Sequence, residues 1–586
     1  MKRKDQKSKD IFTSRMFRRQ LVPSLFSSAG LALADMADAV VVGQSMGTVG
    51  LAAISLCLPF YMILNVLMHG LGIGGSAGYA RLLGEGKPKE AVACFNRVMR
   101  TGVFLGLILA VTVNLFAEGV LHLFGAASAE PAVYAASRSY LRIIACGAPL
   151  FFISYQLRYF LCSDGSERLS GAGFVLGSVA DILANLLFVL HLDWGIRGAA
   201  WATLLGITVS TVCYLPGILS TKNREKKQLR LSLPSFCAGE VFSCFQTGAA
   251  TSCQYLFQMM FLLVANNALI GMAGEKGVAV FDIVQNASYL ILYLYEGTAQ
   301  AMQPLLCTFH GERNTQAADR TLRLGCRSGF AVGGTAAVLV AVFPGAVCRL
   351  FGMDSPVLME YGTSALRLFC LSSFFAGASL LLETYDQSAG EEKSAFLLVF
   401  LRGFAVLLPC TVLFSVTSLR FFFLLYPVCE SVSLLGFFLW RKSRGKAAVF
   451  DEKRVFTATI RGENEDVTGL TEAVGNFCGQ WNEQPRQTYF VMMAVEEICM
   501  AIVAKNRQKA GGVALQITLI ALPEGAFELH FRDNTECFDP FSLHSARVGE
   551  QSGFDMDALG VTVIKQQAKD YFYRNYQGFN SLVVRI

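Results

Sequence analysis

The residues of this sequence that could do chemistry are acids and amides inside apolar stretches. They are Asp38, with Asp35 one helical turn before it, Asp181, with Asn185 one turn after it, and Glu296. A carboxylate inside a membrane-spanning helix is costly unless it faces a water-filled cavity or a partner, so residues of this kind mark ion pathways. They therefore predict proton or cation coupling in a membrane protein.

Two interpretations of these acids stay open at the level of the sequence. Desolvation disfavours the charged form of a carboxyl group, which lets a buried acid take up and release a proton near neutral pH. The same acids could instead only form hydrogen bonds between neighbouring helices. Glu296, and Glu430 midway along the last apolar stretch, are each candidates for a second proton site or for a partner of Arg402.

Composition places these acids in an integral membrane protein. The chain has 586 residues, of which 53% are hydrophobic and 16% are charged, with a mean hydropathy of +0.45. Its 17 cysteines show no metal-ligand spacing, so we expect free thiols and neither a disulfide framework nor a metal site. About twelve apolar stretches reach bilayer length. They are 21–45, 52–80, 98–120, 138–162, 170–192, 196–220, 240–271, 278–308, 325–350, 363–388, 395–416 and 418–440.

Lysine and arginine predict the orientation. The basic segments are the N-terminus and the loops near 81–100, 221–230, 313–327 and 441–446, which fall on one side of the membrane if twelve helices cross it. We therefore expect a multi-pass protein of the plasma membrane with both termini in the cytoplasm. The net charge of +6 is small. The expected partners are membrane lipid and a small-molecule substrate, with no nucleic acid.

The two halves of the apolar region repeat one plan. An offset of 227 residues aligns five positions of the first half with the same residue types in the second: Gly47 with Gly274, Gly70 with Gly297, Gly84 with Gly311, Glu85 with Glu312 and Ala91 with Ala318. Halves of this kind meet at a binding site near the bilayer midplane in secondary transporters. The predicted fold is an all-α membrane protein with two six-helix lobes.

The last part of the chain has the composition of a soluble domain. Its pattern predicts a strand, two helices, two strands, a helix and two strands, which is an α+β sandwich with helices on one face of the sheet. The predicted organisation is a basic N-terminus at 1–20, lobe 1 at 21–220, a linker at 221–239, lobe 2 at 240–440 and a cytoplasmic domain at 441–586.

Four segments in order resemble the MATE (multidrug and toxic compound extrusion) transporters. They are ADAVVVGQSMGTVGLAAISL, GIGGSAGYARLLGEGKPKEA, DILANLLFVLHLDWGIRGAAWAT and GTAQAMQPLLCTFHGERNTQAADR, within roughly 15–440. The resemblance implies two six-helix lobes, a central cavity that opens alternately to each side, and export of a small, lipophilic or cationic substrate driven by H⁺ or Na⁺. It puts Asp38 in the place of the family's cation-linked aspartate.

The chain departs from the family pattern at two points. The family's fifth helix reads Asn and then Asp four residues later, whereas this chain has Asp181 and then Asn185. The acid found in the seventh helix of sodium-coupled members is missing near Gln254, which favours protons over sodium. Two alternatives stay open, a membrane-anchored sensor and a flippase of lipids or lipid-linked saccharides. The flippase would use cavity cations, for which the candidates are Arg142, Arg158 and Arg402.

The segment 450–586 resembles the ATP-binding (GHKL) domains of anti-sigma factors and histidine kinases. The resemblance rests on MAVEEICMAIVAKN, FRDNTECFDP and ALGVTVIKQQAKDYFYRNYQGFNSLVVRI. It implies a nucleotide site with Glu497, Asp533 and Gly560.

The nucleotide site departs from the pattern of that family. Ala501 stands where the family has its magnesium-binding Asn, and Thr535 stands where it has a glycine near the adenine. We therefore expect a degenerate, non-catalytic nucleotide sensor or a module that binds a cytoplasmic protein, and only doubtful binding of ATP and Mg²⁺. A weakly active kinase with Glu496 or Glu497 as base is the alternative.

Overall fold

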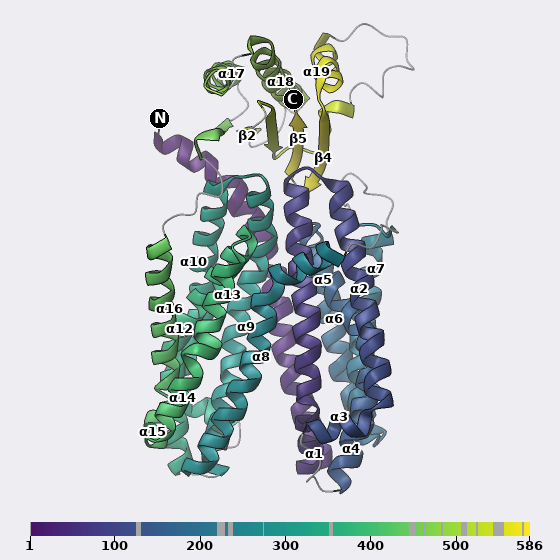
Figure 1. Ribbon diagram of the computed structural model, residues 1–586, viewed down its shortest axis with the longest axis vertical. Coiled ribbons are helices and arrows are strands. Elements are labelled where there is room, and N and C mark those ends of the chain that lie inside the picture. Colours follow the sequence, from purple (N-terminus) through teal and green to yellow (C-terminus); the bar gives the residue numbers. More distant parts are fainter. Residues whose placement is uncertain are drawn as a thin grey trace.

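The computed structural model of this chain is a bundle of long helices with a small α+β domain on one end (Figure 1). We call that end of the bundle the domain end; both termini lie there (Figure 1). The structure describes residues 2–124, 131–219, 229–232, 238–273, 275–350, 356–444, 452–460, 464–481, 484–505, 513–522, 525–542, 556–576 and 579–586.

Lobe 1 is formed by α1 to α7. Its first helix, α1 (Lys2–Gly84), turns back on itself (Figure 1). A Cβ on Gly297 of α9 would lie 3.1 Å from the backbone oxygen of Ser24, and one on Gly84 would lie 3.2 Å from Cα of Gly311. Gly297 and Gly311 are only about 21 Å apart along α9, so the parts of α1 that contact them, at Ser24 and at Gly84, pack along the same helix. The two ends of α1 therefore run side by side. The other helices are α2 (Pro88–Leu115), α3 (Ala117–Leu123), α4 (Pro131–Cys146), α5 (Ala148–Ser163), α6 (Glu167–Asn185), the π-helix η2 (Leu186–His191) and α7 (Gly195–Leu219).

Lobe 2 is formed by α8 to α16 and lies beside lobe 1 in Figure 1. Its helices are α8 (Ala238–Ala273), α9 (Glu275–Gly311), α10 (Thr315–Val342), α11 (Pro344–Leu350), α12 (Pro356–Ala389), α13 (Glu392–Phe400), the π-helix η3 (Leu401–Ala405), α14 (Leu407–Ser415), α15 (Leu419–Phe422) and α16 (Leu425–Arg444).

The internal repeat predicted from the sequence is confirmed by the helix boundaries. Helices α2 and α10 begin and end at residues related by the offset of 227, and so do α3 and α11. Before α2 and α10 the chain makes the same turn, because Gly86 has a φ of +73° and Arg313, 227 residues later, has a φ of +53°. Arg313 is not a glycine, and a positive φ is uncommon for such a residue. The fold of the turn is therefore kept even where its glycine has been lost.

Large apolar side chains cover the outside of the bundle, as a lipid-facing surface requires. Examples on α2 follow helical spacing and are exposed: Phe104, Leu107, Val111 and Leu115. Among the described residues nine helices are long and apolar enough to cross a membrane, and one of these, Pro485–Lys505, belongs to the C-terminal domain. The number of twelve spans stays a prediction. The cysteines that the structure describes are free thiols.

The C-terminal domain, residues 452–586, contains one antiparallel sheet in the order β1-β2-β3-β5-β4. Its elements follow the order expected from the sequence: β1 (Val455–Ile460), α17 (Asn464–Cys478), α18 (Pro485–Lys505), β2 (Leu515–Ala521), β3 (Phe527–Asp533), α19 (Met556–Gln567), β4 (Asp570–Tyr576) and β5 (Phe579–Arg585). Short 3₁₀ helices lie at Glu452–Arg454 and Pro540–Ser542.

Alternation along the strands gives the sheet two different faces. In β3, Phe527, Leu529 and Phe531 belong to the core that the sheet forms with α17, α18 and α19. Between them, Glu528 and His530 point to the opposite face, and yet both are buried. Every residue of β2 and β3 is buried. A sheet covered by helices on one face alone would expose its polar face, so this face is covered as well.

Candidate functional site between the two lobes

The acids predicted in the first helix fall where the structure says little. Asp35 and Asp38 lie in α1, but their side chains lie outside the described residues. Their role as cation-linked acids therefore stays a prediction.

Asp181 and Asn185 are brought together in lobe 1. Both are buried in α6, and Asn185 Nδ2 donates a hydrogen bond to Asp181 Oδ1 over 3.2 Å. Helix α7 packs directly on this pair, because a Cβ on Gly206 would lie only 2.6 Å from Cβ of Asp181. Asn185 is also the last residue before the π-helix η2. Such wide turns are frequent at functional sites.

Lobe 2 also has a π-helix, η3, and it carries a buried cation. Arg402 of η3 donates from Nη2 to Oε1 of Glu430 over 2.9 Å and from Nε to Oε2 over 3.2 Å. The two side chains are 12% and 15% exposed. This bidentate pair answers one question that the sequence left open, because Glu430 of α16 is the partner of Arg402.

Glu383 is an acid that the sequence interpretation missed. It lies in α12, is 4% exposed, and its Oε2 atom has no hydrogen-bond partner among the described residues. It interacts electrostatically with Arg402 and with Glu296. The signal was present in the sequence, because Glu383 stands in the apolar stretch 363–388 just as Glu296 stands in 278–308.

Glu296 takes part in a polar contact between the lobes. Gln300, one turn later in α9, donates from Nε2 to Glu296 Oε1 over 3.1 Å and accepts from Arg158 Nη2 over 3.0 Å. Arg158 belongs to α5 of lobe 1, is 3% exposed, and lies over the ring of Phe174 at 4.1 Å. A cation of lobe 1 is thus linked to an acid of lobe 2 through one amide.

Aromatic side chains surround a histidine beside Arg158. His69 of α1 shares a hydrogen bond of 2.7 Å between its Nδ1 and the hydroxyl of Tyr159. Its ring stacks on Tyr255 of α8 at 5.0 Å and meets Tyr155 edge-on at 5.4 Å. Arg158 interacts electrostatically with His69. The cluster therefore joins three helices from both lobes; nothing in the sequence except His69 in an apolar stretch pointed to it.

These residues make a chain of charges across the bundle. It passes from Arg158 through Glu296 and Glu383 to Arg402 and Glu430, which counts three acids and two guanidinium groups. Guanidinium groups keep their charge in proteins. One carboxylate in this chain therefore lacks a compensating cation unless it holds a proton or another positive ion.

The predicted nucleotide residues lie in the C-terminal domain and make contacts with their own neighbours. Asp533 Oδ1 accepts hydrogen bonds from the backbone nitrogen of Thr535 at 2.8 Å, from its hydroxyl at 2.5 Å and from Asn580 Nδ2 at 2.8 Å. A Cβ on Gly560 would lie 2.2 Å from the carboxyl group of Glu497. No group of three or more His, Cys, Asp or Glu side chains that could hold a metal ion occurs in the described part of the chain.

A family model and several known proteins match this chain. The MatE model matches residues 23–187 and 251–412. The probable multidrug resistance protein YoeA of Bacillus subtilis is 22% identical over 443 residues, which is 72% of this chain and 93% of YoeA. The multidrug export protein MepA of Staphylococcus saprophyticus is 22% identical over 399 residues, or 67% and 86%.

Solved structures show the same fold. A multidrug resistance MATE family transporter of the MOP superfamily, in its outward-facing conformation, superimposes with a TM-score of 0.67 at 23% identity, covering 73% of this chain and 95% of that one. A MOP superfamily transporter of Pyrococcus furiosus gives 0.68 at 22% identity with the same coverage. The residues matched by the family model end at 412, so the C-terminal domain lies outside them.

Proposed function

This chain belongs to the MatE family, and we propose that it is an antiporter that exports small lipophilic or cationic compounds in exchange for protons. The observation that carries the proposal is the uncompensated acid in the buried chain of charges between Arg158 and Glu430. A negative charge inside the membrane is costly, and one proton or one cation removes the cost.

Exchange follows if proton and substrate compete for this acid. With Arg402 paired to Glu430, the acids left to share the excess charge are Glu296 and Glu383. A cationic substrate bound near them favours their ionised form, and a proton on either one disfavours the substrate. Such mutual exclusion is a negative coupling between two ligands, which is what antiport needs. We further propose that Asp38 carries the corresponding proton in lobe 1, so that its protonation from outside biases the first helix towards release of substrate.

The aromatic cluster around His69 supports a lipophilic or cationic substrate. Tyrosine faces attract cations and apolar rings, and three tyrosines meet here close to Glu296. The printed names of YoeA and MepA, which refer to multidrug resistance and export, agree with such a substrate. The alternative, a flippase for anionic lipids, needs free cations in the site. It is weakened because Arg402 is paired with Glu430 and Arg142 lies on the exposed surface, which leaves Arg158 of the three candidate cations in the site.

For the C-terminal domain we propose the GHKL type of fold in a regulatory role, without catalysis. Hydrogen bonds from Thr535 and Asn580 already occupy Asp533 Oδ1, and Glu497 is packed against Gly560, so a nucleotide would first have to displace these contacts. The basic loops lie at the domain end of the bundle, so we place this domain and both termini on the cytoplasmic side of the plasma membrane. A fluorescent ATP analogue that binds the full chain tightly would contradict the loss of the nucleotide site.

Transport into inverted membrane vesicles tests the proposal. A fluorescent lipophilic cation is offered under an imposed pH gradient and, separately, under a sodium gradient, for the wild-type chain and for Asp38→Asn and Glu296→Gln. Glu118→Gln is the matched control, because this acid is 65% exposed and pairs with Arg138 on the surface. We expect uptake that depends on the pH gradient, that is lost in the first two variants and that is unchanged in the control. Uptake driven by sodium alone, or full uptake by both variants, would refute proton coupling through these acids.

A further inference from the structure

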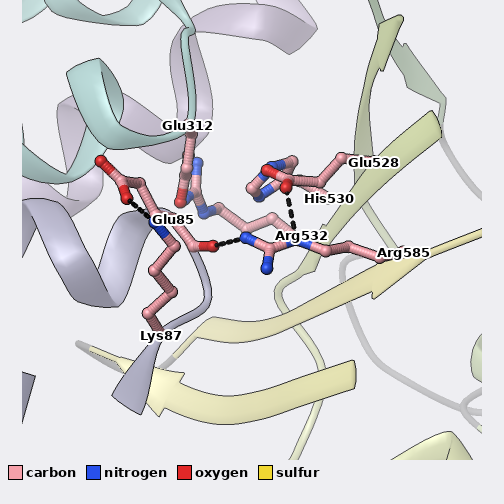
Figure 2. A network of polar contacts seen from close by, with 7 residues as sticks. All are labelled: Glu85, Lys87, Glu312, Glu528, His530, Arg532 and Arg585. Carbon is pink, nitrogen blue, oxygen red and sulfur yellow. Dashed lines mark hydrogen bonds and ion pairs between the residues drawn. The ribbon is translucent and has the colours of Figure 1, made fainter. Parts of the chain in front are cut away.

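The polar face of the C-terminal sheet is covered by the domain end of both lobes. Figure 2 shows this contact, in which strands β3 and β5 meet the turns that follow α1 and α9. The side chains that meet there carry opposite charges and are largely buried, as Glu312 and Arg532 show. Burying so many ionic groups is costly unless they are paired. The contact is therefore a specific joint between two parts of one chain.

Lobe 1 is held through the backbone of its turn. Arg585 Nη2 donates a hydrogen bond of 2.5 Å to the carbonyl oxygen of Glu85. The neighbouring Gly86 has a φ of +73°, and a Cβ at this position would lie 3.1 Å from Cγ1 of Val583. Glycine thus permits both the turn and the close approach of β5. The side chain of Glu85 pairs instead with Lys87, at 2.8 Å.

Lobe 2 is held through the related acid. Arg532 of β3 forms an ion pair with Glu312, and its guanidinium group lies over the ring of Phe309 at 5.2 Å. Glu312 is the residue that the offset of 227 relates to Glu85. The same sheet therefore contacts equivalent turns of the two lobes, one through a carbonyl oxygen and the other through a carboxylate.

The two arginines cannot move apart, because the sheet joins them. Strands β3 and β5 are direct neighbours, with Glu528 opposite Arg585 and Arg532 opposite Ser581. Glu528 ties the strands further, since it accepts from Arg585 Nε at 2.7 Å and shares a 2.8 Å hydrogen bond with His530. Neighbouring strands keep a spacing of about 4.8 Å. The distance between the two attachment points is thus set by the C-terminal domain.

The lobes touch each other directly beneath this joint. Gly84 and Gly311 pack so closely that a Cβ on Gly311 would lie 3.1 Å from Cα of Gly84. Close by, Cys94 of α2 and Cys244 of α8 have their sulfur atoms 3.7 Å apart. The domain end of the bundle is therefore closed in this structure, and opening it would separate the turns that Arg585 and Arg532 bind.

We propose that the C-terminal domain is a clamp that holds the lobes together at the domain end and so restrains the transport cycle. The proposal rests on the antiport function proposed above, and it takes the two lobes to open alternately to each side of the membrane. The contacts to Glu85 and Glu312 can form together only while the lobes are closed at this end, and a contact made in one state alone shifts the population to that state. Release of the domain from either turn would free the lobes to open.

The native cysteine pair gives a test that needs no transport. In the full chain, mild oxidation joins Cys94 and Cys244 while the domain end is closed, and the joined peptides are quantified by mass spectrometry over time. The variants are Arg532→Gln with Arg585→Gln, and separately Glu312→Gln, which leaves the sequence of the domain intact. Arg486→Gln is the matched control, because this arginine lies on the exposed start of α18.

The clamp predicts slower joining in both variants, by about five-fold or more, and an unchanged rate in the control. Joining at the wild-type rate in the double arginine variant would overturn the clamp. Slow joining in the double arginine variant together with a wild-type rate in Glu312→Gln would overturn the clamp as well. The slow joining would then come from loss of the domain's own fold and not from loss of its contact with Glu312. The rate of joining is measured without substrate. Failure of proton-coupled export would therefore leave the result on the clamp standing, and failure of the clamp would leave proton-coupled export standing.

Discussion

The buried pair of Arg402 and Glu430 allows a prediction that separates structural acids from coupling acids. Its atoms are 2.9 and 3.2 Å apart and its side chains are 12% and 15% exposed. Removing one member of such a pair leaves an unpaired charge and typically costs about 3–5 kcal/mol, whereas replacing both by apolar residues of similar size is often neutral. We therefore expect Arg402→Met to destabilise the protein by about 3 kcal/mol or more and Arg402→Met with Glu430→Met by about 1 kcal/mol or less.

Glu383 adds a difference between the two single variants. Arg402 interacts with Glu383 as well as with Glu430, so Glu430→Met leaves the guanidinium with one acid nearby. Arg402→Met instead leaves two acids without their cation. We expect Arg402→Met to be the more destabilising of the two, with the difference set by the repulsion and desolvation of those acids.

Thermal unfolding of the purified variants in one detergent measures these differences, and transport in vesicles shows their functional meaning. The double variant should regain most of the wild-type midpoint and retain coupled uptake, because Glu296 and Glu383 stay in place. A double variant as unstable as Arg402→Met, or one that is stable but has lost proton coupling, would refute the structural role of Glu430.

Three further predictions concern other parts of the chain. Gly206→Val should destabilise lobe 1 by about 1–3 kcal/mol, because its side chain would collide with Asp181, and the loss is measured by the unfolding midpoint. Gly311→Val should separate the lobes at the domain end, since a Cβ there would lie 2.5 Å from the backbone oxygen of Arg81, and it should slow the joining of the cysteine pair. Burial raises the pKa of Glu528, but hydrogen bonds and charges from His530 and Arg585 outweigh this and lower it to about 2. A lowered pKa contributes stability that is present above the ordinary value and is lost as the pH falls. The free energy of unfolding of the wild type should thus fall by about 3 kcal/mol in total between pH 5 and 2, which lowers the unfolding midpoint. The decrease should be smaller in Glu528→Gln.

Hydrophobicity and repetition made much of the fold predictable. The apolar stretches 98–120, 196–220 and 278–308 correspond to α2, α7 and α9, because burial in lipid requires long apolar helices with internal hydrogen bonds. The offset of 227 residues was visible in three glycines, one glutamate and one alanine, and it holds for whole helices such as α2 and α3. Glycines kept for close helix contacts, such as Gly84 and Gly311, explain why these positions carried the signal.

The partners of the buried charges could not be predicted from the sequence. Glu430 and Arg402 lie 28 residues apart, and only the packing of α16 on the π-helix η3 brings them together. The second face of the sheet was missed for a similar reason. The alternation in FELHFRD predicts one polar face, but it does not say that this face binds Glu85 and Glu312, which are far away in the chain.

The central claim is that proton and substrate compete for the acids between the lobes, and proton release tests it most directly. Purified protein in a weakly buffered solution with a pH indicator receives a saturating amount of a lipophilic cation. We predict release of about one proton per chain, and loss of this release in Glu296→Gln and in Glu383→Gln but not in the double variant Arg402→Met with Glu430→Met. Substrate that binds the wild type without releasing protons would contradict the account. Proton release from Glu296→Gln and Glu383→Gln that equals the wild-type release would contradict it as well.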